Sequence, residues 1–175
     1  DEVAVIQRGL PDRESPMTSS WREMTLAAAL AIGFSAHAHN CDPLVFLSLK
    51  VGSKTIAVTE AQLSALPQRV IVTSTNWAKK GSYKGPYLND VVGLAGRGSV
   101  QKLTVYTWDH FKVDIPFSDL AKYGVILATS LDDKRLKLDD WGPMFVMYPY
   151  DDYKELRRPA GLNKMAWQVC RIDIL

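Results

Sequence analysis

From residue 44 onward, the hydrophobic and polar positions predict many short strands with short helices between them. Turn residues separate paired runs, as at Gly52-Ser53 and Asp132-Asp133. Thr59, which precedes an acidic turn, predicts a helix N-cap, and Pro67 ends that helix. The predicted strands are residues 44–50, 54–58, 69–75, 102–108, 111–116, 124–131, 134–138, 144–149 and 165–174. The predicted helices are residues 59–66, 86–95 and 116–123, and residues 76–85 are predicted to form a loop.

This order of elements predicts an α+β domain with a mixed β-sheet rather than a doubly wound fold. With 175 residues, of which 47% are hydrophobic, the chain is long enough for one globular domain with a full core. The net charge is only +2, and no basic stripe alternates with aromatic residues. The sequence therefore gives no sign of a nucleic-acid-binding protein.

The N-terminal region has the three parts of a secretory signal peptide in order. Arg22 precedes a small, apolar run over residues 24–38, and the run ends in Ala36-His37-Ala38, an A-x-A cleavage pattern. The run is shorter than the roughly 20 apolar residues of a transmembrane helix. We therefore expect residues 1–38 to be upstream sequence plus signal peptide, and residues 39–175 to be one domain exported to a periplasm. The alternative is a buried N-terminal helix, which the alanine-rich composition permits.

The two cysteines, Cys41 and Cys170, lie at opposite ends of the predicted domain. They are either disulfide-bonded in an oxidising compartment or two independent thiols, and the sequence leaves both alternatives open. No metal site is predicted, because cleavage after Ala38 would separate His37 from His39, and His110 has no matching ligand pair. No nucleophile and base set is recognisable. The glycines of residues 93–98 follow a predicted helix instead of a strand, which argues against a phosphate loop.

The strand predicted over residues 69–75 ends in an unusual way. Its β-branched residues are followed by Thr73, Ser74 and Thr75, and then by Trp77. Hydroxyl groups beside an indole suit a site for a flat polar molecule, because the ring can stack while the hydroxyls bond its edge.

Several motifs from about Gln68 to the C-terminus together resemble the molybdopterin-binding domain of the sulfite oxidase family. Their order and spacing carry the resemblance more than any single motif. They are the strand with Trp77, Gly85 to Val92 (GPYLNDVV), Asp109-His110-Phe111 leading to Ile115-Pro116, Leu127-Ala128, Leu136, Gly142-Pro143, Tyr148-Pro149 and Trp167-Gln168. The resemblance implies a sulfite-oxidase-like fold.

The chain departs from the enzymes of that family at one position. A cysteine thiolate binds molybdenum in the enzymes, and the alignment on Trp77 puts Thr73 about where that cysteine would be. A neutral hydroxyl is a poor substitute for a thiolate. The chain thus resembles a small, exported branch without the cysteine. Some members of that branch resemble periplasmic proteins that bind a reduced pterin and report it to a membrane-bound enzyme that makes or degrades cyclic di-GMP.

The resemblance and the side-chain chemistry together give a candidate pterin site. Its candidate residues are Thr73, Thr75, Trp77, Tyr83, Asp109, Phe111 and Trp167. The aromatic residues would stack on the ring, and Asp109 would accept hydrogen bonds from its N–H groups. For Trp167 core packing is an equal alternative, and Asp109 is also a plausible turn residue.

The predicted function is therefore a periplasmic, non-catalytic pterin-binding protein whose partner is the periplasmic domain of a cyclic di-GMP cyclase or phosphodiesterase. No cofactor is required, and a reduced pterin is the ligand. One alternative is an oxidoreductase that binds molybdopterin without the cysteine, and another is an interaction domain with a vestigial pocket. Residues 76–85 and 150–158 are the predicted partner surface, through residues such as Tyr150 and Tyr153. Asp151-Asp152 would cap a solvated helix there.

Overall fold

The computed structural model describes residues 40–96 and 98–175, which belong to one compact unit, His37–Leu175. The predicted signal peptide and the predicted cleavage after Ala38 lie outside the described residues. The strands are β1 (Leu47–Val51), β2 (Lys54–Val58), β3 (Gln68–Thr73), β4 (Gly81–Pro86), β5 (Lys102–Thr107), β6 (Lys112–Pro116), β7 (Ile126–Ala128), β8 (Ser130–Leu131), β9 (Lys134–Arg135), β10 (Phe145–Met147) and β11 (Val169–Ile174). The helices are α1 (Glu60–Ala65), α2 (Leu88–Gly93), α3 (Phe117–Tyr123), the 3₁₀-helix η1 (Lys154–Arg157) and α4 (Pro159–Leu162).

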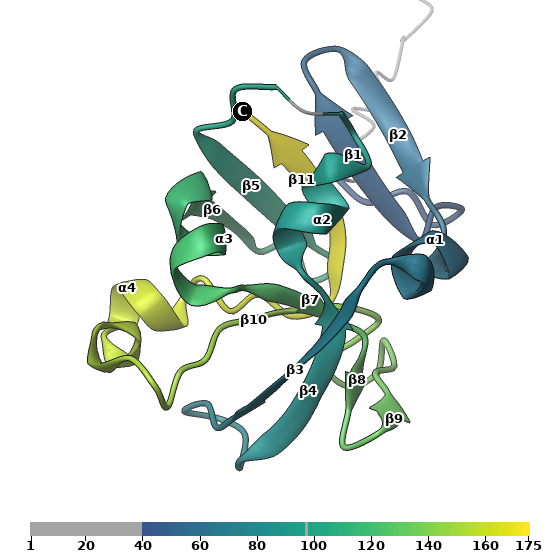
Figure 1. Cartoon of the computed structure of the whole chain (residues 1–175). Coiled ribbons are helices and arrows are strands. Elements are labelled where there is room, and N and C mark those ends of the chain that lie inside the picture. Colours follow the sequence, from purple (N-terminus) through teal and green to yellow (C-terminus); the bar gives the residue numbers. More distant parts are fainter. Residues whose placement is uncertain (1–39, 97) are drawn as a thin grey trace, which may run out of the picture. The chain divides into compact units, whose positions relative to one another are not determined.

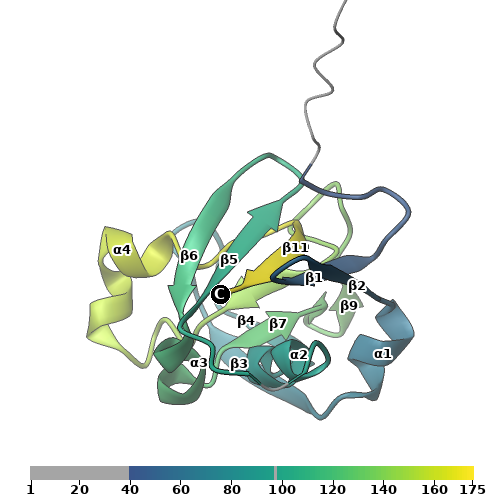
Figure 2. The same cartoon turned by 90° about the horizontal axis from the view of Figure 1, so that it is seen from above.

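The strands form three sheets, and one of them is mixed. The largest has the order β2-β1-β11-β5-β6, in which β1 and β11 are parallel and the other pairs antiparallel. The second has the order β3-β4-β8-β9, and β7 pairs with β10 in the third. Figure 1 shows the β7–β10 pair between the two larger sheets, and Figure 2 shows α1, α2 and α3 along one side of the unit. This is an α+β architecture with a mixed sheet, as the sequence predicted.

The core is centred on β7 and β10. Residues 125–128 and 144–148 are fully buried, which means that both faces of these strands are covered. Strands buried on both faces have continuous apolar sequences instead of alternating ones. This explains why these two runs are uniformly hydrophobic, whereas β5 and β6 alternate.

Several local predictions are confirmed. Thr59 caps α1 with a full capping box, in which its hydroxyl accepts the Gln62 N–H and the Gln62 side chain accepts the Thr59 N–H. Asp132 and Asp133 have positive φ angles of 49° and 59°, as the two central residues of a tight β8–β9 turn need.

The loop predicted over residues 76–85 is wrong in its second half, because residues 81–86 form β4 and pair along the whole of β3. Glycine and lysine gave this segment a low strand propensity. Gly85 is nevertheless required there, because a Cβ on it would collide with the backbone carbonyl of Leu127. The glycine marks a close approach of β4 to β7 rather than a loop.

The last strand also begins later than predicted. It starts at Val169 instead of residue 165, because Gln168 has a φ of 53° and its side-chain amide donates to the carbonyl of Leu138 at 2.7 Å. Trp167 therefore lies in the turn that leads into β11, and not in the strand itself. The helix predicted over residues 86–95 is also shorter, since α2 spans Leu88–Gly93.

Cys41 and Cys170 are joined in a disulfide, with their Cα atoms 5.5 Å apart. Of the two alternatives left open by the sequence, the structure has the bonded one. The bond ties the segment that precedes β1 to β11, across 129 residues of chain. Cross-links that close long loops restrict the unfolded chain, so we expect this one to stabilise the fold by about 2–4 kcal/mol.

Candidate functional site

The hydroxyl groups at the end of β3 have partners within the protein. Thr73 is fully buried, and its Oγ1 accepts a hydrogen bond from the Asp151 N–H at 3.0 Å. The Ser74 hydroxyl donates to Asp151 Oδ1 at 2.6 Å, and the Ser74 N–H donates to Oδ2 at 3.0 Å. Thr73, Ser74 and Asp151 thus form a clamp, which we call the Asp151 clamp, between the end of β3 and the segment after β10.

Asp151 was predicted to cap a helix, and this interpretation is wrong. The nearby helix, η1, begins after Tyr153 and has no side-chain cap. The Asp151 carboxylate instead accepts hydrogen bonds from the hydroxyl and the N–H of Ser74, which directly follows β3. The hydrogen bond from the Ser74 hydroxyl is the main cause that lowers the pKa of Asp151, with smaller contributions from the Ser74 N–H, Lys80 and Arg157.

Thr75 shapes the turn that carries Trp77. Its Oγ1 accepts the N–H of Ala78 at 2.9 Å and that of Trp77 at 3.3 Å, and its own N–H donates to the Ala78 carbonyl. A hydroxyl that bonds backbone groups two and three residues ahead fixes a turn locally. The side chain of Thr75 therefore positions Trp77, and Thr75 is not among the residues that line the cavity described next.

Trp77 lines a cavity of about 160 Å³. The cavity walls come from the turn after β3, the β5–β6 turn and the segment from α4 to β11. The lining residues are Trp77, Asp109, Phe111, Leu162, Asn163, Met165, Ala166 and Trp167. The structure thus brings four of the seven candidate residues together, namely Trp77, Asp109, Phe111 and Trp167.

The aromatic rings of the cavity remain partly open to solvent. Trp77 is 37% exposed and Phe111 is 43% exposed. The rings of Trp77 and Trp167 meet edge to face, with centroids 5.3 Å apart and an interplanar angle of 70°. An exposed indole held against a second indole offers an apolar surface to a planar ring.

Asp109 is the acidic residue among the lining side chains. Its Oδ1 accepts hydrogen bonds from the Thr107 hydroxyl and, at 3.2 Å, from the Phe111 N–H. These bonds confirm that Asp109 is a turn residue. Both end on Oδ1 among the described residues, which leaves Oδ2 available to accept a donor at the cavity.

Tyr83 and Thr73 lie away from this cavity. Tyr83 is fully buried on β4, where its ring packs edge to face on Phe145 at 5.9 Å. Burial raises the pKa of Tyr83, and Asp132 and Asp140 raise it further. Within the described part of the chain its hydroxyl has no hydrogen-bond partner. The Phe145 ring in turn meets the Trp167 ring edge to face, with centroids 6.3 Å apart, so Phe145 lies between Tyr83 and Trp167.

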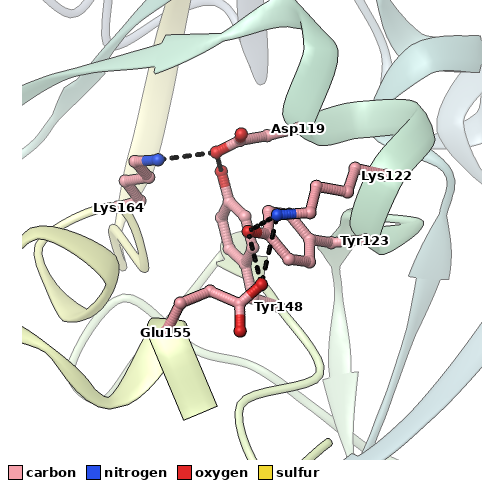
Figure 3. Close-up of polar contacts among 6 residues, drawn as sticks. All are labelled: Asp119, Lys122, Tyr123, Tyr148, Glu155 and Lys164. Carbon is pink, nitrogen blue, oxygen red and sulfur yellow. Dashed lines mark hydrogen bonds and ion pairs between the residues drawn. The ribbon is translucent and has the colours of Figure 1, made fainter. Parts of the chain in front are cut away.

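The wall formed by residues 162–166 is fixed by a partly buried ion pair that the sequence did not reveal. Lys164 Nζ lies 2.7 Å from Asp119 Oδ2, and the Tyr148 hydroxyl donates to the same oxygen at 3.1 Å (Figure 3). Burial is the main cause that raises the pKa of Tyr148, so this hydroxyl stays a donor. Lys164 is between Asn163 and Met165, which both line the cavity. Asp119 lies in α3, Tyr148 directly follows β10 and Lys164 follows α4, so the three partners are too far apart in sequence for any local pattern to show.

The residues present do not fit a molybdenum centre of the sulfite oxidase type. Such a centre needs a thiolate, and Cys41 and Cys170 are joined to each other. The Thr73 hydroxyl is occupied, since it accepts from Asp151 and donates to the Ser74 carbonyl at 3.3 Å. Among the described residues, no three His, Cys, Asp or Glu side chains gather as a metal site would need.

A larger hollow of about 590 Å³ lies between α2 and the start of α3. Its described lining residues are Leu66, Pro67, Asn89, Asp90, Val92, Gly93, Leu94, Gly96, Gly98, Val100 and Phe117, of which Phe117 is the aromatic one. It is wide and lacks stacked rings, so the Trp77 cavity is the better candidate for a specific planar ligand. In the part of the chain that the structure describes, no helix is long and apolar enough to cross a membrane.

No protein-family model matches the chain, and no curated protein matches it. Among solved structures, it is similar to the crystal structure of the sulfane dehydrogenase SoxCD from Paracoccus pantotrophus, with 16% sequence identity and a TM-score of 0.57. The two share a fold. The match covers 74% of this chain and 38% of that chain, so well under half of the SoxCD chain is matched. The likeness supports the fold family expected from the sequence, and at this identity it carries no activity with it.

Proposed function

We propose that this protein is an exported, non-catalytic binding protein for a reduced pterin, and that the pterin ring occupies the Trp77 cavity. The observation that carries the proposal is the aromatic lining by Trp77, Phe111 and Trp167, with the carboxylate of Asp109 beside them. These residues come from three separate segments of the chain, which the fold brings to one place.

The size of the cavity favours a small ring system. Sites for drug-sized ligands enclose about 300–1,000 Å³, whereas this cavity encloses about 160 Å³. A pterin is a flat, fused heterocycle with an amino group and ring N–H groups along one edge. Its faces would contact the indoles, and its N–H groups would donate to Asp109, as a charge-assisted bond requires.

Export is supported by the Cys41–Cys170 disulfide, because such bonds persist in oxidising compartments such as the periplasm. It agrees with the signal peptide expected over residues 24–38. Mature protein would then begin at His39, two residues before the first cysteine.

Reporting to a partner requires that the cavity and a partner surface are connected. The two predicted partner segments are held together near the cavity. The Tyr150 hydroxyl donates to Asn76 Oδ1 at 2.6 Å, and Lys80 lies 3.9 Å from Asp151. Trp77 belongs to the same turn as Asn76, so movement of Trp77 around a ligand would reach the surface at residues 150–158. The partner that we propose, on family resemblance alone, is the periplasmic domain of a membrane-bound cyclic di-GMP enzyme.

The direct experiment is to purify the protein from its exported location and to analyse the denatured extract by mass spectrometry and elemental analysis. The proposal predicts a pterin without a dithiolene group, at up to one per chain, and no stoichiometric molybdenum. About one molybdenum per chain would favour the oxidoreductase alternative. Absence of any pterin, together with no uptake of added reduced pterin, would favour the interaction domain.

A further inference from the structure

The two larger sheets end in β2, β6, β3 and β9, and three of these edges carry charged or proline residues at exposed positions. These are Lys54 in β2, Lys112, Asp114 and Pro116 in β6, and Lys134 and Arg135 in β9. Charges and proline on an edge prevent pairing with another chain. β3 also carries one exposed charge, Arg69, but its guanidinium lies over the Tyr87 ring and donates to the Tyr87 hydroxyl. The other exposed side chains of β3 include Val70 and Val72, with exposed fractions of 47% and 55%. Figure 1 shows β3 at the margin of its sheet.

The direction of the β3 backbone groups follows from its neighbours. On β4, the carbonyls of Ser82 and Lys84 accept N–H groups from the β8 side. In an antiparallel ladder successive residues face opposite edges, so the intervening β4 residues face β3. Their partners on β3 are Arg69, Ile71 and Thr73. The N–H and C=O groups of residues 68, 70 and 72 therefore point away from the sheet, along the free edge.

The usable length of this edge is set by the Asp151 clamp. The Ser74 N–H points to the same side and is already bonded to Asp151. The open part of the edge therefore runs from Gln68 to Val72 and has Val70 at its centre. A strand that pairs with the whole of it by two-fold symmetry places Val70 opposite Val70 of the second strand, and Val72 opposite Gln68.

We propose that β3 is an interface between two copies of this chain, which pair antiparallel about Val70 to join their four-stranded sheets. A second copy fits this edge because the edge is self-complementary: apolar side chains meet at the centre and no like charges oppose each other. Lys84, which is opposite Val70 on β4, stays one strand removed from the two-fold axis. The inference is independent of the cavity and of its ligand.

A charge-swap experiment tests the register as well as the interface. Val70→Glu places two glutamates opposite each other in the dimer but faces Lys84 favourably within one copy. Val51→Glu on β1 is the matched control, because Val51 is 38% exposed and is also opposite a lysine, Lys54. The full chain is studied by sedimentation over a series of concentrations. Wild type is expected to form a reversible dimer, and Val70→Glu to raise its dissociation constant about tenfold or more, since symmetry counts each change twice.

Mixing Val70→Glu with Val70→Lys is expected to restore dimers, whereas Val51→Glu is expected to behave as wild type. A wild type that stays monomeric at all concentrations would overturn the proposal, as would a Val70→Glu protein that dimerises like wild type. Hydrogen exchange tests the same interface in the wild-type protein, without any substitution. The amides of Val70 and Val72 are expected to exchange more slowly as concentration rises, and those of β2 to stay unchanged. Equal exchange at every concentration would also overturn the proposal.

Discussion

Trp77 owes its position to its neighbours. The Thr75 hydroxyl fixes the turn, and the edge-to-face contact with Trp167 holds the ring at 5.3 Å while 37% of the residue stays exposed. A ligand in the cavity would cover the exposed part of the Trp77 ring and so remove apolar surface from water. We therefore expect Trp77 to contribute to ligand binding more than to folding.

Trp77→Ala is therefore expected to lose roughly 1–3 kcal/mol of binding free energy for a reduced pterin, the scale of base stacking on an aromatic side chain. Folding is expected to change little. Titration calorimetry measures the first quantity and thermal unfolding without ligand measures the second. Trp108→Ala is the control, since Trp108 lines a different hollow with Pro43 and Leu44. Unchanged affinity in folded Trp77→Ala protein would remove Trp77 from the site.

Asp151 gives the fold a pH dependence. Its bonds from Ser74 lower its pKa below the usual 3.8. A carboxyl with a lowered folded-state pKa stabilises the protein above pH 3.8 and loses that contribution as the pH falls through the folded-state value. We expect Asp151→Asn to reduce the acid-induced loss of stability below about pH 4. Urea unfolding at several pH values checks this prediction. If the free energy of unfolding falls with decreasing pH equally steeply in Asp151→Asn and in wild type, the Asp151 clamp carries no charge-dependent stabilisation.

For single residues, the sequence predicted which aromatic and acidic side chains meet at the cavity better than it predicted the partners of the hydroxyl groups. Trp77, Asp109, Phe111 and Trp167 meet at one cavity, as a single planar ligand would require. Thr73 and Thr75 were expected beside them and have internal partners instead. The partner of Thr73, Asp151, is 78 residues away, and no pattern within one strand can reveal a bond of that sequence separation.

Among the elements, the wall of residues 162–166 depends on α3 for its position. Lys164 and Asp119 retain only 23% and 11% side-chain exposure, and Tyr148 completes their contact. The same region has a second pair, Lys122 with Glu155, whose side chains are 56% and 48% exposed (Figure 3). The two lysines provide a matched comparison.

Lys164→Met is expected to leave Asp119 with an unpaired buried charge and to lower the free energy of unfolding by about 1–3 kcal/mol. Because Lys164 lies between two cavity residues, the Lys164→Met substitution should also weaken pterin binding, although residue 164 does not contact the pterin. Lys122→Met is expected to change neither quantity measurably. Chemical denaturation and calorimetry compare the two variants. If Lys164→Met binds with wild-type affinity, the ion pair does not position the wall.

Elements with a strong local signal were predictable, and those set by tertiary contact were not. The α1 capping box, the β1–β2 and β8–β9 turns and the buried runs of β7 and β10 follow from propensity and period. The β4 strand does not follow from them, because glycine is required at position 85 by the close approach of the Leu127 backbone, which is a tertiary contact. The start of β11 likewise depends on the positive φ of Gln168 and its bond to Leu138.

For the whole molecule, the sequence predicted the α+β class, and the likeness to SoxCD supports the fold family at 16% identity. The disulfide was one of two open alternatives, since only the fold brings residues 41 and 170 within bonding distance. Both cysteines of this chain are joined in the disulfide, and the Thr73 hydroxyl at the end of β3 has internal partners. Together with the small aromatic cavity, these observations support our proposal that the protein binds a pterin ring without a metal.

Calorimetric titration of the full chain with a reduced pterin, under conditions that prevent its oxidation, tests that claim most directly. We expect saturable binding with one pterin per chain, weakened in Trp77→Ala and retained in Trp108→Ala. Folded, ligand-free wild type that shows no binding of the reduced pterin at any concentration tested would contradict it.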